Sequence, residues 1–213
     1  MESRMTKIFS KKESSIALKI YQGHFATPNS HITHYFDMTT LKTRASEAKA
    51  VARVLAQQYS NTTVVDTIVC IDGTEVIGAY LAEELTNAGI MSMNTHQTIY
   101  ITTPETNASG QIMFRENCKM MIDQKNVLIL MASATTGSTL NSVLESVLYY
   151  GGRVSGVAAI FSNISKIAGM DIYSIFNGQD VPGYQSHLPG KCPLCAAGTK
   201  IDALVNGYGY SKL

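Results

Sequence analysis

Hydrophobic and polar positions along the first half of the chain follow two different periods. After Arg44, apolar residues recur every three or four positions through RASEAKAVARVLAQQY, which predicts an amphipathic helix that ends near Ser60. DTIVCI (residues 66–71) is a short run of mostly β-branched apolar residues between polar ones, as is typical of a buried strand. VIGAYLAEELTNAG then predicts a second helix, which ends at the glycine Gly89.

The same alternation continues through the second half. QTIYITT (97–103) predicts a strand, and the turn formers of PETNASGQ (104–111) predict a mobile loop. NVLILMA (126–132) and RVSGVAAIFS (153–162) predict buried strands, and TLNSVLESVLYYGG between them predicts a helix. Strands that are apolar on both faces and alternate with helices predict an α/β fold: a doubly wound, mostly parallel sheet flanked by helices.

Composition narrows the class of protein. With 213 residues, 45% hydrophobic and 15% charged, the chain is expected to fold as one domain. A net charge of +1 gives no general attraction to nucleic acid or to an anionic membrane, and neither is expected as a partner. The polar start MESRMTKIFSKKESS is not an export signal, and four cysteines do not make a disulfide framework, so we expect a cytoplasmic protein.

Ligands of such sheets bind beyond the carboxyl ends of the strands, where strand meets helix. Two junctions stand out, IDGTEVIG (71–78) and SATTGST (133–139). Small residues let the backbone approach a ligand, amides at a helix start favour an anion, and the hydroxyls of the second junction add donors for phosphate oxygens. The alternative is an ordinary turn in which Ser or Thr caps the helix. No Gly-Lys-Ser/Thr follows, so this is not a Walker motif.

Three segments resemble a known family. VLILMASATTGSTL (127–140) resembles the phosphoribosyl-pyrophosphate signature of type I phosphoribosyltransferases, in which an apolar strand ends in two acidic residues, two small ones and Thr-Thr-Gly-x-Thr. GHFATPNSHITHYFD (23–37) resembles the N-terminal hood of the orotate enzymes, and DTIVCIDGTEVIGAYLAEEL resembles their pyrophosphate-loop strand and helix. The resemblance implies one phosphoribosyltransferase-like domain, with a small hood at 1–43, an α/β core at 44–175 and a C-terminal segment at 176–213.

The resemblance also implies a site, a ligand and an assembly. The phosphate would be held by Ser133, Ala134, Thr135, Thr136, Gly137, Ser138 and Thr139. The pyrophosphate would face Asp72, Gly73 and Thr74, the base would lie under Phe25 and Tyr35, and Arg115 would be the catalytic loop cation. The implied ligand is phosphoribosyl pyrophosphate or another sugar phosphate or nucleotide, with magnesium as cofactor and a homodimer as the assembly.

The sequence departs from the family pattern in three places. Met131 and Ala132 stand where the acidic pair accepts hydrogen bonds from the ribose hydroxyls. Such bonds are worth about 1.5–3 kcal/mol each, so losing two removes roughly 3–6 kcal/mol, or about 10²- to 10⁴-fold in affinity. Residues 102–112 contain no basic side chain, which leaves Arg115 and then Lys119 as the nearest cations, and Pro28 stands where the hood usually has a lysine.

Cys192 and Cys195 form a Cys-x-x-Cys pair, which supplies half of a zinc site. His187 is a candidate third ligand and a second subunit a candidate source of the fourth; a redox pair and a plain reduced turn are the alternatives. The hood histidines, including His31-x-x-His34, are expected to be polar surface residues that line a ligand cleft rather than metal ligands. For the C-terminal NGYGYSKL we expect packing on a partner subunit or a loose tail.

Three functions fit these observations. The first is an orotate phosphoribosyltransferase-like enzyme of nucleotide metabolism that transfers ribose 5-phosphate to a nucleobase. The second is a non-catalytic nucleotide or sugar-phosphate sensor that has lost the acidic ribose-binding pair. The third is an enzyme whose donor lacks the ribose diol or the pyrophosphate.

Overall fold

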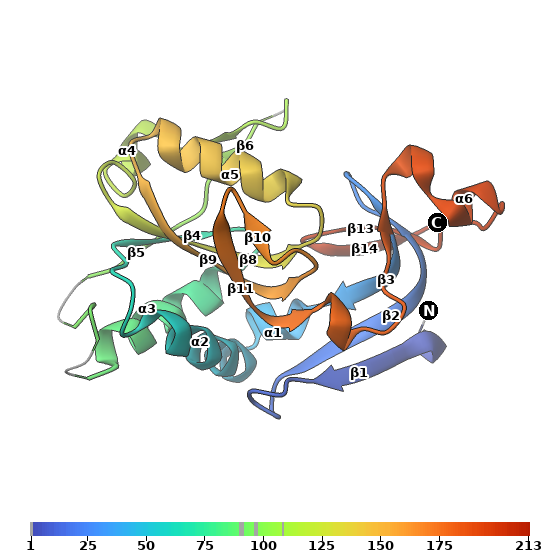
Figure 1. The fold of residues 1–213 in the computed structure, drawn as a ribbon, viewed down its shortest axis with the longest axis horizontal. Helices are drawn as coiled ribbons and strands as arrows, with labels where there is room; N and C mark the ends of the chain where they lie inside the picture. Colours follow the sequence, from blue (N-terminus) through green and yellow to red (C-terminus); the bar gives the residue numbers. More distant parts are fainter. Residues whose placement is uncertain (1, 90–91, 96–97, 108) are drawn as a thin grey trace.

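Two β-sheets lie next to each other, and both ends of the chain pair with the same one (Figure 1). The computed structural model describes residues 2–89, 92–95, 98–107 and 109–213. In that part of the chain, no helix is long and apolar enough to cross a membrane.

One of the two six-stranded sheets, here called the core sheet, has the strand order β10-β11-β9-β8-β4-β5. All neighbouring pairs are parallel except β10 with β11. Its strands are β4 (Thr67–Cys70), β5 (Tyr100–Thr102), β8 (Asn126–Ala134), β9 (Arg153–Ser162), β10 (Lys166–Ile167) and β11 (Met170–Asn177). The predicted strands at 66–71, 126–132 and 153–162 are therefore present as β4, β8 and β9, and the predicted strand at 97–103 is the shorter β5, with Gln97 outside the described residues.

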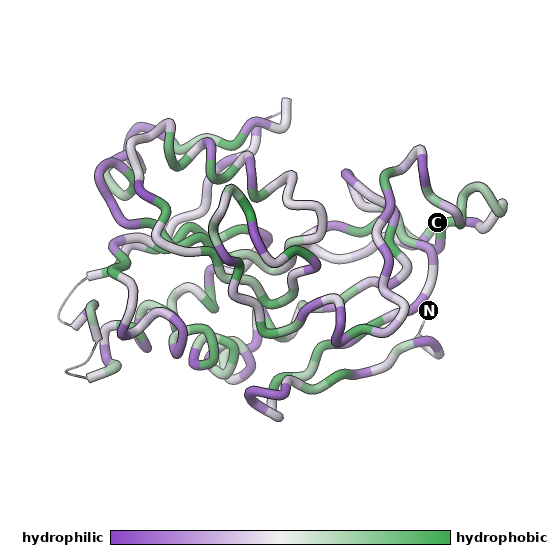
Figure 2. The backbone as a smooth tube through the Cα atoms, in the orientation of Figure 1, coloured by the Kyte–Doolittle hydropathy of each residue, from purple (hydrophilic) through white to green (hydrophobic). Residues whose placement is uncertain are grey.

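Helices cover both faces of the core sheet (Figure 1). The helices are α1 (Thr39–Thr43), α2 (Ala45–Tyr59), α3 (Glu75–Asn87), α4 (Glu116–Lys119), α5 (Ser138–Tyr149) and α6 (Pro193–Ala196), with short 3₁₀ turns at Glu2–Arg4, Gly178–Asp180 and Pro189–Lys191. Side chains of β8 alternate between two buried clusters: Leu128 and Leu130 pack with α2 and α3, whereas Val127 and Ile129 pack with α5. The central strands are correspondingly rich in hydrophobic residues (Figure 2), and the predicted doubly wound α/β fold is confirmed.

The second six-stranded sheet, here called the hood sheet, has the order β12-β3-β2-β13-β14, and β1 also pairs with β2. Its strands are β1 (Met5–Phe9), β2 (Ala17–Ala26), β3 (His31–Asp37), β12 (Ser186–His187), β13 (Ala203–Asn206) and β14 (Gly209–Lys212). β1 pairs with the first half of β2 and β13 with its last two residues. The C-terminal segment thus completes the hood, because its Ala203 and Val205 pack on Phe25 and Tyr35.

The segment predicted as a mobile loop, 104–111, is part of a short hairpin. β6 (Glu105–Thr106) pairs with β7 (Ile112–Met113). The Asn107 side chain holds the turn, since its Oδ1 accepts hydrogen bonds from the backbone amides of Ser109 and Gln111 at 3.0 and 2.9 Å. Asn and Gly in the segment therefore specify a hairpin turn here rather than an open loop.

Candidate functional site

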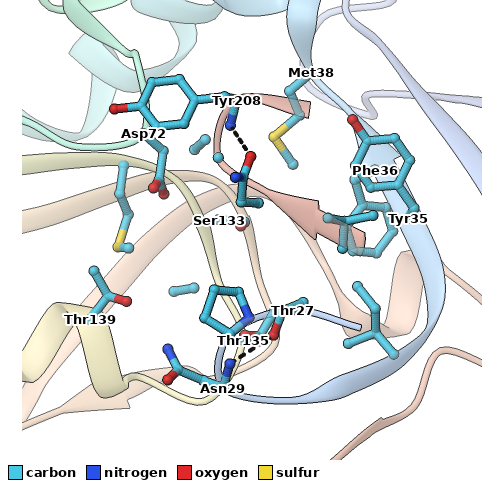
Figure 3. Close-up of a pocket in the computed structure, with 18 of the residues that line it drawn as sticks. Thr27, Asn29, Tyr35, Phe36, Met38, Asp72, Ser133, Thr135, Thr139 and Tyr208 are labelled. Carbon is cyan, nitrogen blue, oxygen red and sulfur yellow. Dashed lines mark hydrogen bonds between the residues drawn. The ribbon is translucent and has the colours of Figure 1, made fainter. Parts of the chain in front are cut away.

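A cavity of about 290 Å³ lies between the core sheet and the hood sheet (Figure 3). Its lining comes from the hood (Thr27, Pro28, Asn29, Ile32, Tyr35, Phe36, Met38), α1 (Thr39, Lys42), the end of β4 (Asp72), the end of β8 and the start of α5 (131–140), and the C-terminal hairpin (205–209). It is near the lower end of the size of small-molecule sites, about 300–1,000 Å³. Its position beyond the carboxyl ends of β4 and β8 is where α/β sheets bind ligands.

All seven residues of the predicted phosphate loop, 133–139, line this cavity. Gly137 is the N-cap of α5 and has φ +80°, a conformation that glycine adopts without strain. Gly137 has no side chain that could cap the helix, and the one side-chain contact to the first turn is long, since the Ser138 amide lies 3.5 Å from the Thr136 hydroxyl among the described residues. The first turn of α5 therefore lines the cavity with amides that have no intrahelical partner, flanked by the hydroxyls of Thr135 and Thr139 (Figure 3).

Met131 and Ala132, the residues in place of the acidic pair, are buried and belong to the same lining. Met131 also packs in the cluster under α5, and Ala132 packs in the cluster on the opposite face of the sheet. Alanine offers no hydrogen-bond acceptor, and the thioether of methionine is only a weak one. This end of the cavity is therefore apolar where the family pattern is anionic.

The three predicted pyrophosphate-loop residues have different positions. Asp72 lines the cavity and has φ +60°, whereas Gly73 and Thr74 are not in the lining. The buried Thr74 hydroxyl lies 3.0 Å from the carbonyl of Ile71 and 3.1 Å from that of Leu130. Thr74 therefore ties the end of β4 to β8 and is not free to contact a ligand.

Lys42 is a site residue that the sequence analysis missed. It is 8% exposed, and its Nζ donates to the backbone carbonyls of Asp72 and Gly207 at 2.6 and 2.5 Å. Burial lowers the pKa of the Lys42 ammonium and raises the pKa of the Asp72 carboxyl, although each charge partly offsets the shift of the other. Among the described lining residues these are the only ionisable side chains apart from tyrosines. Because Lys42 belongs to no motif, only the placement of α1 reveals it.

The C-terminal hairpin forms one wall of the cavity instead of a loose tail. Gly207 lies so close to Asp72 that an added Cβ would be 2.6 Å from the carboxylate Oδ1. Tyr208 is 89% exposed at the rim, and its amide donates to Asn206 Oδ1 at 2.9 Å (Figure 3). The glycines of NGYGY thus allow the β13–β14 turn to pack directly over the pyrophosphate-loop aspartate.

The hood supplies one of its two predicted residues to the cavity. Tyr35 lines it, whereas Phe25 is fully buried in the hood's own hydrophobic cluster. The expectation that the hood histidines line a cleft is wrong: His24 and His34 are buried, and neither they nor His31 belong to this lining. His31 and His34 are three residues apart on a strand, so their side chains point to opposite faces.

Arg115, the predicted loop cation, is on the surface. Its Nε and an Nη donate to the two carboxylate oxygens of Glu105 at 2.6 and 2.7 Å. Neither Arg115 nor Lys119 is among the residues that line the cavity. Glu105, which lies within the segment 102–112, therefore neutralises the nearest arginine.

The Cys-x-x-Cys pair meets histidines, but not the expected one. Cys192 and Cys195 lie against His24 and His31. His187 is not in this group; its Nε2 lies 3.2 Å from Gln185 Oε1. Sequence spacing gave no indication of His24, which is 168 residues away from Cys192.

Comparison with known proteins finds similarity to orotate phosphoribosyltransferases. No protein-family model matches the chain. It is 25% identical over 198 residues to an orotate phosphoribosyltransferase of Carboxydothermus hydrogenoformans, covering 92% of this chain and 93% of that protein. It is 26% identical over 189 residues to the orotate phosphoribosyltransferase of Chlorobaculum parvum, covering 86% and 88%.

Solved structures show the same fold. The orotate phosphoribosyltransferase of Mycobacterium tuberculosis H37Rv superposes with a TM-score of 0.53 at 15% identity, over 78% of this chain and 93% of that one. An adenine phosphoribosyltransferase from Thermoanaerobacter pseudethanolicus gives 0.51 at 15% identity, over 83% and 96%. The chain therefore has the type I phosphoribosyltransferase fold and resembles orotate phosphoribosyltransferases along nearly its whole length.

Proposed function

We propose that this chain is a phosphoribosyltransferase that holds the 5-phosphate of its ligand on the 133–139 loop and a nucleobase toward the hood. The observation that carries the proposal is that the N-terminus of α5 lines the cavity together with the hydroxyls of Thr135 and Thr139. Amides at a helix start bind anions through their N–H groups and the helix dipole. The names of the relatives support transfer to a base, with orotate as the first base to test.

Lys42 contributes a positive charge and Asp72 a negative charge to the proposed site. Lys42 supplies the positive charge toward an anionic ligand, and its carbonyl contacts keep the ammonium in place. Asp72 opposes an anion while it is ionised, and the raised pKa of this buried carboxyl reduces that opposition. Lys42 therefore takes the place of the absent hood lysine as the cation of the cavity.

Magnesium is the cofactor that the resemblance implies, and the residues present fit it only weakly. Magnesium is usually held by one or two carboxylates together with substrate phosphates. Asp72 is the one carboxylate among the described lining residues, and the Lys42 ammonium binds its main-chain carbonyl. These residues do not form a magnesium site by themselves.

A specific observation supports the second candidate, a binding protein without turnover. Met131 and Ala132 offer no carboxylate acceptor to a ribose diol, and Arg115 is paired with Glu105 away from the cavity. Departure of pyrophosphate develops negative charge, which pre-placed cations normally stabilise. If the protein transfers a phosphoribosyl group, we expect the rate of orotate-dependent pyrophosphate release to be at least about 10²-fold lower than in an enzyme with the acidic pair.

A thermal-shift screen followed by a turnover assay tests both candidates. The full chain is mixed with phosphoribosyl pyrophosphate, orotidine 5-phosphate or ribose 5-phosphate, with and without magnesium, and pyrophosphate release is measured with orotate or a purine base. A ligand that binds the native state stabilises it by RT ln(1 + [L]/Kd), about 2.7 kcal/mol at 100 times Kd. Thr135→Val with Thr139→Val removes two hydroxyls at nearly constant shape; Thr6→Val, on an exposed position of β1, is the control.

Three outcomes are distinguishable. Stabilisation that the loop variant weakens, together with turnover, supports transfer. The same stabilisation without turnover for any base supports the binding protein. An unshifted melting temperature with every phosphorylated ligand, or equal shifts in the loop variant and in Thr6→Val, contradicts both.

A further inference from the structure

A second constellation lies in the hood, outside the cavity. It joins His24 on β2 and His31 at the start of β3 to Cys192, the N-cap of α6, and Cys195 within that helix. One ligand atom from each of the four residues lies within 4.8 Å of all the others. None of these residues lines the cavity, so this group is independent of the proposed function.

Four of the distances within the group, from 3.1 to 3.6 Å, are close to those of a tetrahedral metal site. His24 Nε2 lies 3.1 Å from His31 Nδ1, and it lies 3.5 and 3.6 Å from the sulfurs of Cys192 and Cys195. Cys195 Sγ lies 3.2 Å from His31 Nδ1. Tetrahedral zinc, with bonds of about 2.0–2.1 Å to nitrogen and about 2.3 Å to sulfur, sets neighbouring ligand atoms roughly 3.3–3.8 Å apart.

A β-bulge in β2 positions His24 within this group. The register of β2 with β3 shifts between Gln22 and Phe25, so Gly23 and His24 form a bulge that redirects the histidine. The Asp202 carboxylate fixes the bulge, because it accepts the His24 amide at 2.9 Å and is paired with Arg4. His24 itself is 1% exposed.

The hydrogen bond of the other ring nitrogen assigns the tautomer of His24. Its Nδ1 lies 2.9 Å from the carbonyl oxygen of Thr199. A carbonyl only accepts, so Nδ1 carries the proton and Nε2 presents its lone pair to the two sulfurs and to His31. A histidine that ligates a metal usually makes this same contact through its second nitrogen.

We propose that His24, His31, Cys192 and Cys195 bind a structural Zn²⁺ ion. Two thiolates and two imidazoles in tetrahedral array select zinc, and four protein ligands leave no open position for a substrate. Both cysteines are free thiols in the structure, so no disulfide competes for them. The ion ties β2 and β3 to the segment that leads through Asp202 into β13, and hence to the C-terminal wall of the cavity.

Metal analysis of the full chain tests the site. The protein is produced with zinc, purified under a thiol reductant, and its metal content measured by mass spectrometry. We expect stoichiometric zinc in the native protein and its loss in Cys192→Ser with Cys195→Ser. Cys118→Ser and His187→Gln, which change a free cysteine and a histidine outside the group, are expected to keep the metal. Metal-free native protein after titration with zinc, or zinc retained by the double variant, overturns the proposal.

A second measurement covers the case in which the double variant does not fold. Cobalt is exchanged for zinc in the native protein and in His24→Gln, and the absorption spectrum is recorded. We expect thiolate-to-cobalt charge-transfer bands with tetrahedral ligand-field bands in the native protein, and an altered ligand field in His24→Gln. Chelation of the native protein is expected to lower its melting temperature, and added zinc to restore it, because metal binding contributes to folding. Octahedral cobalt without charge-transfer bands contradicts the site.

Discussion

The side chain at position 131 sets how well the cavity accepts a ribose diol. Met131 lines the cavity at the position where the family pattern has a carboxylate. Met131→Asp is therefore expected to tighten binding of phosphoribosyl pyrophosphate by about 10- to 100-fold, since a hydrogen bond to a charged acceptor is worth about 1.5–3 kcal/mol. Calorimetry on both proteins measures the change.

Met131→Asn is the matched control for that prediction. It has nearly the same shape as aspartate and buries a polar group at the same place without adding a charge. We expect it to gain much less affinity than Met131→Asp. Equal affinities in the two variants and the native protein would show that the diol of the ligand does not reach residue 131.

Asp72 controls how the cavity responds to pH. Burial raises the pKa of this carboxyl, so its charge, which repels an anion, is lost as the pH falls through the raised value. We expect binding of sulfate, whose own charge is constant over this range, to tighten as the pH is lowered from neutral. Asp72→Asn should bind sulfate roughly tenfold more tightly than the native protein at neutral pH, and the difference should shrink in acid.

The geometry of Asp72 makes that substitution a fair test. Asparagine tolerates the positive φ of this position, and Lys42 donates to the main-chain carbonyl, which the variant keeps. Because the pKa of Asp72 is raised in the folded protein, the ionised carboxylate lowers the free energy of unfolding at pH values above that pKa. Asp72→Asn should therefore not lower the melting temperature at neutral pH. Asp171→Asn, at an exposed position of β11, is the control; a pH-independent ratio between native and Asp72→Asn affinities would contradict the role of the charge.

At the scale of elements, the β8–loop–α5 unit depends on the left-handed conformation of Gly137. An added Cβ there would also lie 3.0 Å from the ends of Ile164 and Ile167. We expect Gly137→Ala to lower the free energy of unfolding by about 1–2 kcal/mol from the backbone conformation alone, and to weaken binding of phosphate ligands because the loop must shift. Denaturant unfolding and calorimetry measure the two effects.

Gly89 offers a matched control, because it has φ +82° after the end of α3 and an added Cβ there meets no atom of the described residues within 4 Å, its chain neighbours aside. Gly89→Ala should therefore show a comparable conformational cost and unchanged ligand binding. If both variants bind phosphate ligands like the native protein, the 133–139 loop is not the anion site.

At the scale of the whole molecule, local sequence patterns predicted the strands and helices of the core sheet, whereas the hood sheet depends on pairing between segments far apart in the chain. The periodicity of β8 and of α5 is contained within a dozen residues, so the sequence was enough to predict them and the loop between them. The C-terminal strand β13 pairs with β2 across almost the entire chain, and no local pattern records that. Lys42 and His24 are isolated residues whose roles depend on which distant segments fold against them.

Because the cavity lies between the two sheets, a bound ligand should protect both from hydrogen exchange. Loop 133–139 comes from the core, whereas residues 27–42 and 205–209 come from the hood, α1 and the C-terminal hairpin. At a ligand concentration 100 times Kd, the free energy of any opening motion that disrupts the binding site rises by about 2.7 kcal/mol. Amide hydrogen exchange at the site should therefore slow about 100-fold. The measurement is hydrogen exchange by mass spectrometry with ribose 5-phosphate, with ribose as control, and β10–β11 as a reference segment outside the cavity. Protection confined to 133–139 would mean that the ligand binds the core loop without the hood, and that the two sheets do not form one site.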